Sequence, residues 1–151
     1  MALSVWGRPR TTLDLDFLVL TDVQNLEILS RVAVRAGLRV DQKWLKWNPL
    51  LRGTQLRLHS SEITVDLLVP RDEHDRAAFR RKRRRKLGKK FYSIISPEDF
   101  ILQKLKVGRP RDFEDAVTVL ERLRGTLSLR YLRGWARRLG ILGELDFVLK
   151  L

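Results

Sequence analysis

Three aspartates have a spacing that suits the binding of divalent metal ions. Asp14 and Asp16 alternate with apolar residues in the segment 13–20, and Asp66 lies in a second apolar segment. Alternate residues of a strand point to the same face, so we expect Asp14 and Asp16 to lie roughly 7 Å apart at the backbone. Carboxylate oxygens are the ligands that magnesium prefers. Phosphoryl and nucleotidyl transfer use such ions to neutralise phosphates and to activate a hydroxyl.

A simpler interpretation exists for part of this pattern. Asp14 and Asp16 alone are also typical of the polar face of an edge strand. Asp66 is the more unusual residue, because an aspartate among valine and leucine is costly to bury unless it borders a cleft or binds something. The three residues together favour a site for Mg²⁺ or Mn²⁺.

The charge of the chain points to anionic partners. Its 151 residues include 31 Lys and Arg against 18 Asp and Glu, a formal net charge of +13. Such an excess attracts polyanions, so nucleotides and nucleic acids are the favoured partners. Part of the charge forms nearly one block: Arg80, Arg81, Lys82, Arg83, Arg84, Arg85 and Lys86. A solvated, self-repelling segment and a phosphate-binding surface are equally good interpretations of this block.

Other classes of site and location are disfavoured by composition. The chain has no cysteine, which excludes disulfides, thiolate zinc sites and cysteine nucleophiles. His59 and His74 are far apart in sequence, and we expect solvated or structural roles for them. No apolar run approaches the roughly 20 residues needed to cross a bilayer, and residues 1–6 lack the pattern of a secretory signal. We therefore expect a globular cytoplasmic protein with no membrane partner.

The first half of the chain predicts a sheet with one helix. Residues 13–20 form the first expected strand, followed by a helix that Asp22 caps. Residues 54–59 and 62–69 alternate polar and apolar side chains, which predicts a hairpin that joins the same sheet. Residues 42–49 fit neither the helical nor the strand period, and we expect a loop or a short edge piece there.

The second half predicts mainly helices. Residues 71–90 indicate a helix followed by a mobile basic segment. Ser96 caps a helix that runs towards Val107, and Asp112 opens another. Residues 128–139 predict a basic amphipathic helix, with a short apolar tail after it.

These elements predict one domain, 1–151, of mixed α/β (α+β) class. Its expected parts are a sheet core over 1–70, a basic segment over 71–95 and a helical portion over 96–151. The first strand has no predicted strand before it. An exposed sheet edge at this position would favour a homodimer.

Two groups of motifs resemble one enzyme superfamily. The segment 6–16, which reads WGRPRTTLDLD, resembles the catalytic strand of the DNA polymerase beta-like nucleotidyltransferases. The resemblance is to their minimal members in toxin-antitoxin and abortive-infection systems. The helical portion of these proteins is similar to the segments 96–99 (SPED) and 108–112 (GRPRD) and to Lys104. The resemblance thus spans most of the chain, from Trp6 to about Leu120.

The resemblance implies a function and assigns residues to it. Asp14, Asp16 and Asp66 would hold two metal ions, and Asp66 would help to activate the acceptor hydroxyl. Arg10 and Lys104 would lie near the triphosphate of a bound nucleoside triphosphate. The acceptor would be a hydroxyl of RNA, tRNA included, or of a protein. As the toxin of a toxin-antitoxin pair, the chain would have an antitoxin protein as a partner.

One departure from the superfamily leaves alternatives open. Its members carry a Gly-Gly or Gly-Ser turn shortly before the Asp-x-Asp strand, whereas this chain begins at Met1-Ala2, where that turn should end. Either the start is truncated or the protein is a degenerate member. A degenerate member would be a nucleic-acid-binding module on a nucleotidyltransferase scaffold. A metal-dependent nuclease that uses the same carboxylates is the third hypothesis.

Overall fold

The structure is a computed structural model that describes residues 2–8, 14–21 and 23–151. Helices and short sheets occur together, which confirms the mixed α/β class. Within the described residues, no helix has the length and apolar character needed to span a membrane. Contacts divide the chain into a sheet unit, Thr11–Arg76, and a helical unit, which combines Met1–Arg10 with Ala77–Leu151. The boundary between the units falls within one helix, α4 (Glu73–Arg80).

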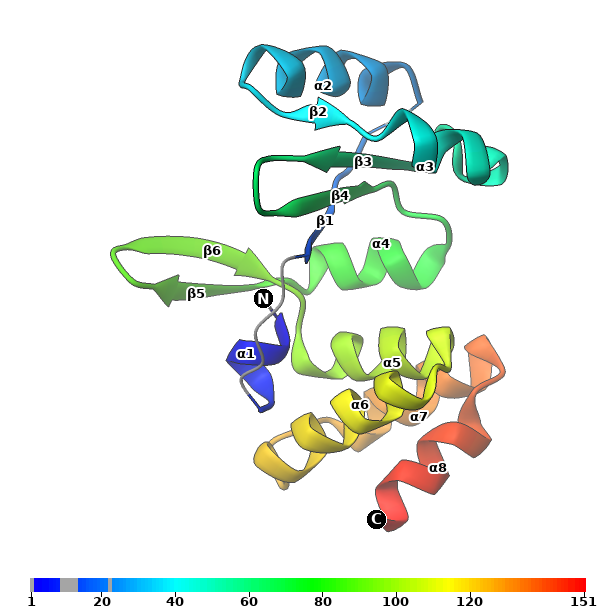
Figure 1. Cartoon of the computed structure of the whole chain (residues 1–151). Helices are drawn as coiled ribbons and strands as arrows, with labels where there is room; N and C mark the ends of the chain where they lie inside the picture. Colours follow the sequence, from blue (N-terminus) through cyan, green and yellow to red (C-terminus); the bar gives the residue numbers. More distant parts are fainter. Residues whose placement is uncertain (1, 9–13, 22) are drawn as a thin grey trace. The chain divides into compact units, whose positions relative to one another are not determined.

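The sheet unit is built on four strands in the order β1-β4-β3-β2 (Figure 1). Their bounds are β1 (Asp14–Leu18), β2 (Arg39–Val40), β3 (Gln55–His59) and β4 (Thr64–Leu68). β3 and β4 form an antiparallel hairpin, and β1 pairs with β4 in parallel. The structure therefore confirms the predicted hairpin and its place in the sheet of the first strand.

One face of this sheet is apolar and is packed against a helix. Leu56 and Leu58 of β3 are buried with Leu26 of α2 (Val23–Arg35). Apolar residues at helical spacing give α2 the stripe that this packing needs. The helix ends before Gly37, whose φ of 89° suits a residue without a side chain. The predicted cap, Asp22, lies outside the described residues.

The expected loop at residues 42–49 is instead helical. The structure has a short helix, α3 (Gln42–Trp47), followed by a 3₁₀ turn, η1 (Pro49–Leu51). Asp41 caps α3, because its Oδ1 accepts a hydrogen bond from the Trp44 amide at 2.8 Å. The prediction was wrong because a six-residue helix is too short to show an apolar period. The signal that remains is its cap, Asp41.

The expected mobile basic segment is instead a hairpin. Residues Arg83–Leu87 form β5, which pairs antiparallel with β6 (Lys90–Ile94). Gly88 lies in the connecting turn with a φ of 60°, which a glycine adopts at no steric cost. A basic strand thus gains a partner that is rich in β-forming residues, and this pairing was not visible from the charge of the block alone.

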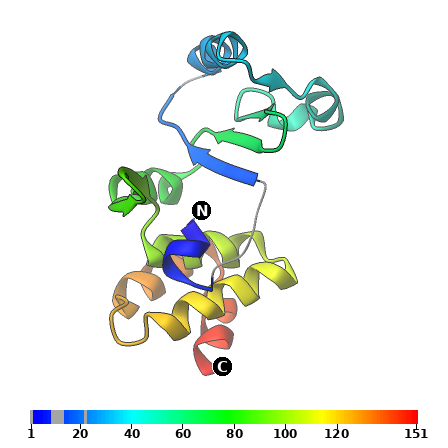
Figure 2. The ribbon, with the colours of Figure 1, turned by 60° about the vertical axis from the view of Figure 1, so that its left-hand side comes forward.

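The helical unit contains five helices in addition to the last residues of α4 and the hairpin, counted over the described residues (Figure 2). They are α1 (Ala2–Trp6), α5 (Pro97–Val107), α6 (Pro110–Arg122), α7 (Leu129–Leu139) and α8 (Leu142–Lys150). Ser96 caps α5, as its sequence context predicted, and Ser128 caps α7. The expected apolar tail is α8, whose Leu145 and Val148 complete the core of this unit.

Candidate functional site

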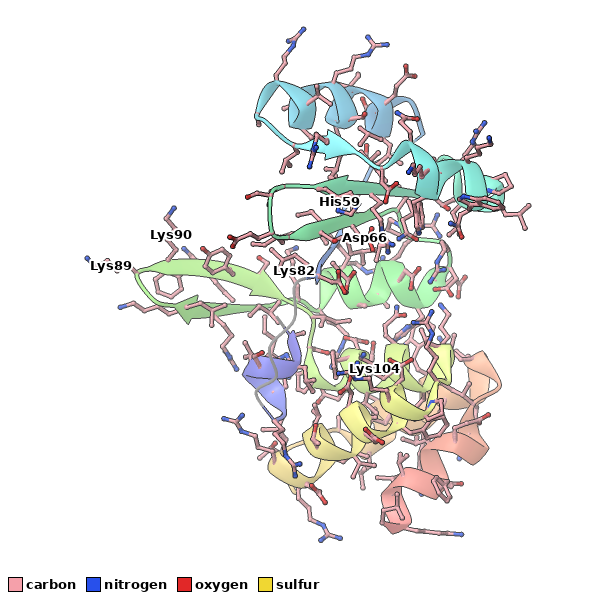
Figure 3. The ribbon with its side chains drawn as sticks, viewed as in Figure 1. His59, Asp66, Lys82, Lys89, Lys90 and Lys104 are labelled. Atoms are coloured by element: carbon pink, nitrogen blue, oxygen red, sulfur yellow. The ribbon has the colours of Figure 1, made fainter. Side chains whose placement is uncertain are left out.

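The three predicted metal ligands lie on one face of the sheet unit. In the parallel pair of β1 and β4, Asp16 is the register partner of Asp66, and Asp14 is two residues away on the same face. Arg57 of β3 is the antiparallel partner of Asp66. This carboxylate face is opposite to the face that packs against α2. Figure 3 shows Asp66 and the neighbouring His59 on the sheet.

Asp66 is buried and paired with an arginine. Only 5% of the residue is exposed. Arg57 donates from Nε to Oδ1 at 2.8 Å and from Nη2 to Oδ2 at 2.6 Å, a forked arrangement that satisfies both carboxylate oxygens. These hydrogen bonds raise the pKa of Arg57, with a further contribution from the charge of Asp14. The guanidinium also lies 4.7 Å from the ring centroid of Trp44.

A second polar group lies beside this pair. His59 Nε2 is 2.8 Å from Oδ2 of Asp41, and its Nδ1 is 3.2 Å from the hydroxyl of Thr64. The hydrogen bond to His59, with that from the Trp44 amide, lowers the pKa of Asp41. Residues 39–43 and 59–64 line a surface hollow of about 560 Å³. His59 thus links β3 to the start of α3 and borders the carboxylate face.

Another group in the sheet unit could hold a metal ion. Asp72, His74 and Asp75 bring one ligand atom each within 4.8 Å of one another, and both His74 and Asp75 are buried. The two carboxylates also accept backbone hydrogen bonds at the start of α4. Asp72 Oδ1 accepts a hydrogen bond from the Asp75 amide at 2.8 Å, and Asp75 Oδ2 accepts one from the Arg71 amide at 2.9 Å. The sequence DEHD at 72–75 carries this pattern, but the sequence led us to expect a solvated or structural role for His74.

Asp14, Asp16 and Asp66 do not form such a compact group among the described residues. Sharing a face is a weaker condition than converging on one ion. Because Arg57 already binds both oxygens of Asp66, a metal ion would have to share this carboxylate with the guanidinium or displace it. The assignment of the three aspartates as metal ligands stays a prediction.

The two cations predicted to lie near the triphosphate have different outcomes. Arg10 lies outside the described residues. Lys104 belongs to α5 of the helical unit, where its Nζ is 2.8 Å from both Oδ1 of Asp112 and Oδ2 of Asp115. Burial lowers the pKa of Lys104, but the hydrogen bonds to the two aspartates outweigh burial and raise it. Lys104 therefore ties α5 to α6 through Asp112 and Asp115.

Two residues of the basic block pair with acids of the helical unit. Arg81 pairs with Glu98 and Asp99, and Arg83 also reaches Glu98. Asp99 is fully buried and accepts a hydrogen bond from the hydroxyl of Tyr131 at 2.6 Å. Burial and this hydrogen bond raise the pKa of Tyr131. Arg81 and Arg83 therefore anchor the hairpin to the helical unit.

The remaining residues of the block are exposed: Arg80, Lys82, Arg84, Arg85 and Lys86. Three of them lie over aromatic rings. Lys82 contacts Phe79, Arg84 contacts Phe91, and Arg85 contacts Trp6. Such contacts hold a long side chain in place while its charge stays exposed to solvent.

The sequence interpretation missed Arg57 as a partner of the carboxylates. Its signal was the alternation within QLRLH at 55–59, which places Gln55, Arg57 and His59 on the polar face of the predicted hairpin. Register then decides which of these residues meets Asp66. Register depends on the whole hairpin, and no single residue reveals it.

Comparison of the sequence with known proteins does not assign the chain to a family. No model of a known protein family matches the chain, and a search of the curated proteins finds no match. The resemblance to nucleotidyltransferases therefore stays a prediction. Function has to be inferred from the carboxylate face, the Asp72 group and the basic hairpin.

Proposed function

We propose that the chain transfers a nucleotide from a nucleoside triphosphate to a hydroxyl of RNA or protein, with Mg²⁺ or Mn²⁺. The observation that carries the proposal is the shared face of Asp14, Asp16 and Asp66, with Asp16 and Asp66 in register on adjacent parallel strands. Three carboxylates offer the hard oxygen donors that these ions prefer. The ions would neutralise the triphosphate and lower the pKa of the attacking hydroxyl.

Arg57 is the best candidate for a phosphate contact in this site. It presents a forked donor beside the carboxylates, and the same fork fits phosphate oxygens. When Asp66 turns to a metal ion, Arg57 is released toward the anionic end of the nucleotide. Lys104 is less suitable, because Asp112 and Asp115 already engage its ammonium group.

Calorimetric titration of the chain with each nucleoside triphosphate, with and without magnesium, tests this function. We expect magnesium-dependent binding that Asp16→Asn removes, because the amide keeps the shape of the side chain and loses its charge. Glu62→Gln is the matched control, since Glu62 is an exposed acid in the β3–β4 turn of the same unit. If Asp16→Asn binds the nucleotide as the parent does, the carboxylates do not hold the metal, and the mechanism is wrong.

A second candidate function is nucleic-acid binding without transfer. The forked pair of Arg57 with Asp66 favours it, because both partners are already satisfied without a metal. The exposed cations of the hairpin favour it as well. It predicts affinity for RNA or DNA that falls steeply with salt and survives Asp16→Asn. Affinity that does not change with salt would exclude this candidate.

The cellular role suggested by the resemblance is that of a toxin with an antitoxin partner. It depends on the transfer reaction, so its test follows the calorimetry. We expect induced expression to slow growth of a bacterial host and Asp16→Asn to relieve the effect. Equal growth inhibition by both forms would separate toxicity from the carboxylate face.

A further inference from the structure

The outer face of the β5–β6 hairpin combines cations with an exposed aromatic ring. Register pairs Arg84 with Ser93 and Lys86 with Phe91, so these four side chains share one face. Ile94 belongs to the opposite face and is buried in the core of the helical unit. The four outer residues are all exposed, and Phe91 keeps 58% of its surface accessible.

The charge of this outer face is not neutralised by neighbouring acids. Residues 80–96 contain nine Lys and Arg and no Asp or Glu. Arg81 and Arg83 are paired with acids of α5. For Arg84 and Lys86, by contrast, the described part of the chain provides no acidic partner. The cations of the outer face are therefore available to an external anion.

The tip of the hairpin carries two further cations. Lys89 and Lys90 lie at its far end and point away from it (Figure 3). Five residues in each strand give the hairpin a length of about 17 Å at roughly 3.4 Å per residue. The hairpin is thus an elongated basic element, and its outer face carries Arg84, Lys86 and, near the tip, Phe91.

Arg84 and Phe91 are in contact on the outer face. The guanidinium of Arg84 lies 4.7 Å from the ring centroid of Phe91, on the same face of the hairpin. An exposed aromatic ring beside cations matches a ligand that carries flat bases along an anionic backbone. Bases are available for stacking in a single strand, whereas in a duplex they are already stacked and paired.

We infer that the outer face of the β5–β6 hairpin binds single-stranded nucleic acid, with a base on Phe91 and phosphates on Arg84 and Lys86. This inference deepens the second proposed function and rests on it, because it names the surface and the form of nucleic acid. It does not require nucleotide transfer. The carboxylate face has no part in it.

Fluorescence anisotropy with a labelled RNA of twelve uridines tests the inference over a series of salt concentrations. We expect Phe91→Leu to weaken binding about tenfold, because leucine keeps the apolar character and loses the stacking surface. Phe91→Trp should retain the affinity. The exposed position of Phe91 makes all three forms compatible with folding, and circular dichroism checks this.

The charged pair is tested in the same assay. Arg84→Ala with Lys86→Ala should reduce the slope of log affinity against log salt by about 1.4, since each single-strand phosphate contact contributes about 0.7. The matched control removes Arg124 and Arg130, two exposed cations elsewhere in the helical unit. We expect the control to change the slope by less than half as much.

The outcomes separate this inference from the broader function. If the parent binds the RNA and the variants at Phe91, Arg84 and Lys86 bind equally well, the hairpin inference is wrong while nucleic-acid binding stands. If the parent binds no nucleic acid, both are wrong. A duplex of the same length bound as tightly as the single strand, or vesicles with one-third phosphatidylserine bound in its place, would also overturn the inference.

Discussion

At the scale of single residues, the pair of Arg57 and Asp66 is the most informative contact of the sheet unit. Asp66 alone would be a poorly solvated charge between two strands, and its burial is tolerated because the fork of Arg57 satisfies both oxygens. A metal ion at Asp66 would compete with this contact for the same carboxylate. Stability and activity therefore make opposite demands on this residue.

Replacement of Arg57 is expected to destabilise the sheet unit. Arg57→Gln leaves Asp66 with a weaker partner, and we expect a loss of about 2 kcal/mol in the free energy of unfolding. Amide hydrogen exchange of β3 and β4 measures it. The control is Arg31→Gln, because Arg31 pairs with Glu27 on the surface, where both side chains are 71% exposed. That exposed pair should contribute less than about 1 kcal/mol.

A second replacement shows where the loss of stability arises. Arg57→Gln combined with Asp66→Asn should recover part of the lost stability, since a neutral side chain needs less compensation for burial. If the double variant is as unstable as the sum of the two single variants, the charge of Asp66 is not the cause. The packing of Arg57 on Trp44 would then be the better explanation.

Asp41 gives the expected pH dependence of the same unit. Its pKa is lowered below the ordinary value of 3.8 by the hydrogen bond to His59 and then by that to the Trp44 amide. A lowered folded-state pKa adds stability above pH 3.8, and this stability is lost as pH falls through the folded-state value. The Trp44 amide resonance should therefore titrate with a midpoint below 3.8. A midpoint at or above 3.8 would contradict the assignment.

At the scale of elements, the sequence predicted those whose signals are local. The cap Ser96 and the glycine at 108 mark the two ends of α5 within a few residues, and the structure has them at these positions. The β3–β4 hairpin was predicted by alternation on both sides of a short turn. Elements that depend on a partner were missed, because β5 has no apolar pattern of its own and pairs only with β6.

The sequence also predicted the candidate site only in part. Alternation alone placed Asp14 and Asp16 on one face, and the hairpin placed Asp66 on a strand of the same sheet. The fork of Arg57 could not be predicted, because it depends on the register between strands. The cluster of Asp72, His74 and Asp75 depends on how one helix begins.

The contact of α1 with α6 provides a test at the scale of elements. A Cβ added to Gly7 would lie 2.7 Å from Oγ1 of Thr118 and 3.0 Å from Cγ2 of Val119. The Gly7 carbonyl accepts a hydrogen bond from Nη1 of Arg122 at 2.6 Å, so the backbone has little freedom to retreat. We expect Gly7→Ala to lower the free energy of unfolding of the helical unit by about 1–3 kcal/mol.

Gly134 is the matched control for this substitution. It lies inside α7, and a Cβ there would meet nothing within 4 Å. Gly134→Ala should stabilise the same unit by about 0.5–1 kcal/mol, since alanine favours a helix. Thermal unfolding of both variants checks the pair of expectations. Equal effects of the two substitutions would show that α1 does not pack closely on α6.

At the scale of the whole molecule, the residues that the structure describes form two separate hydrophobic cores. Leu58 belongs to the smaller core, in the sheet unit, and Leu132 to the larger, in the helical unit. No residue is shared between the two clusters. Stability can then differ between the units, and a single midpoint of unfolding would not describe both.

Reciprocal core substitutions measure this independence. Leu58→Ala and Leu132→Ala each remove a fully buried side chain, at a cost of about 2–5 kcal/mol to the core that loses it. We expect Leu58→Ala to lower amide protection in β3 and β4 and to leave α5 and α7 protected, with the reverse for Leu132→Ala. Hydrogen exchange read by mass spectrometry resolves these segments. If either substitution lowers protection equally in both units, the chain unfolds as one cooperative body. A substitution at the carboxylate face would then also destabilise the hairpin that we infer to bind nucleic acid.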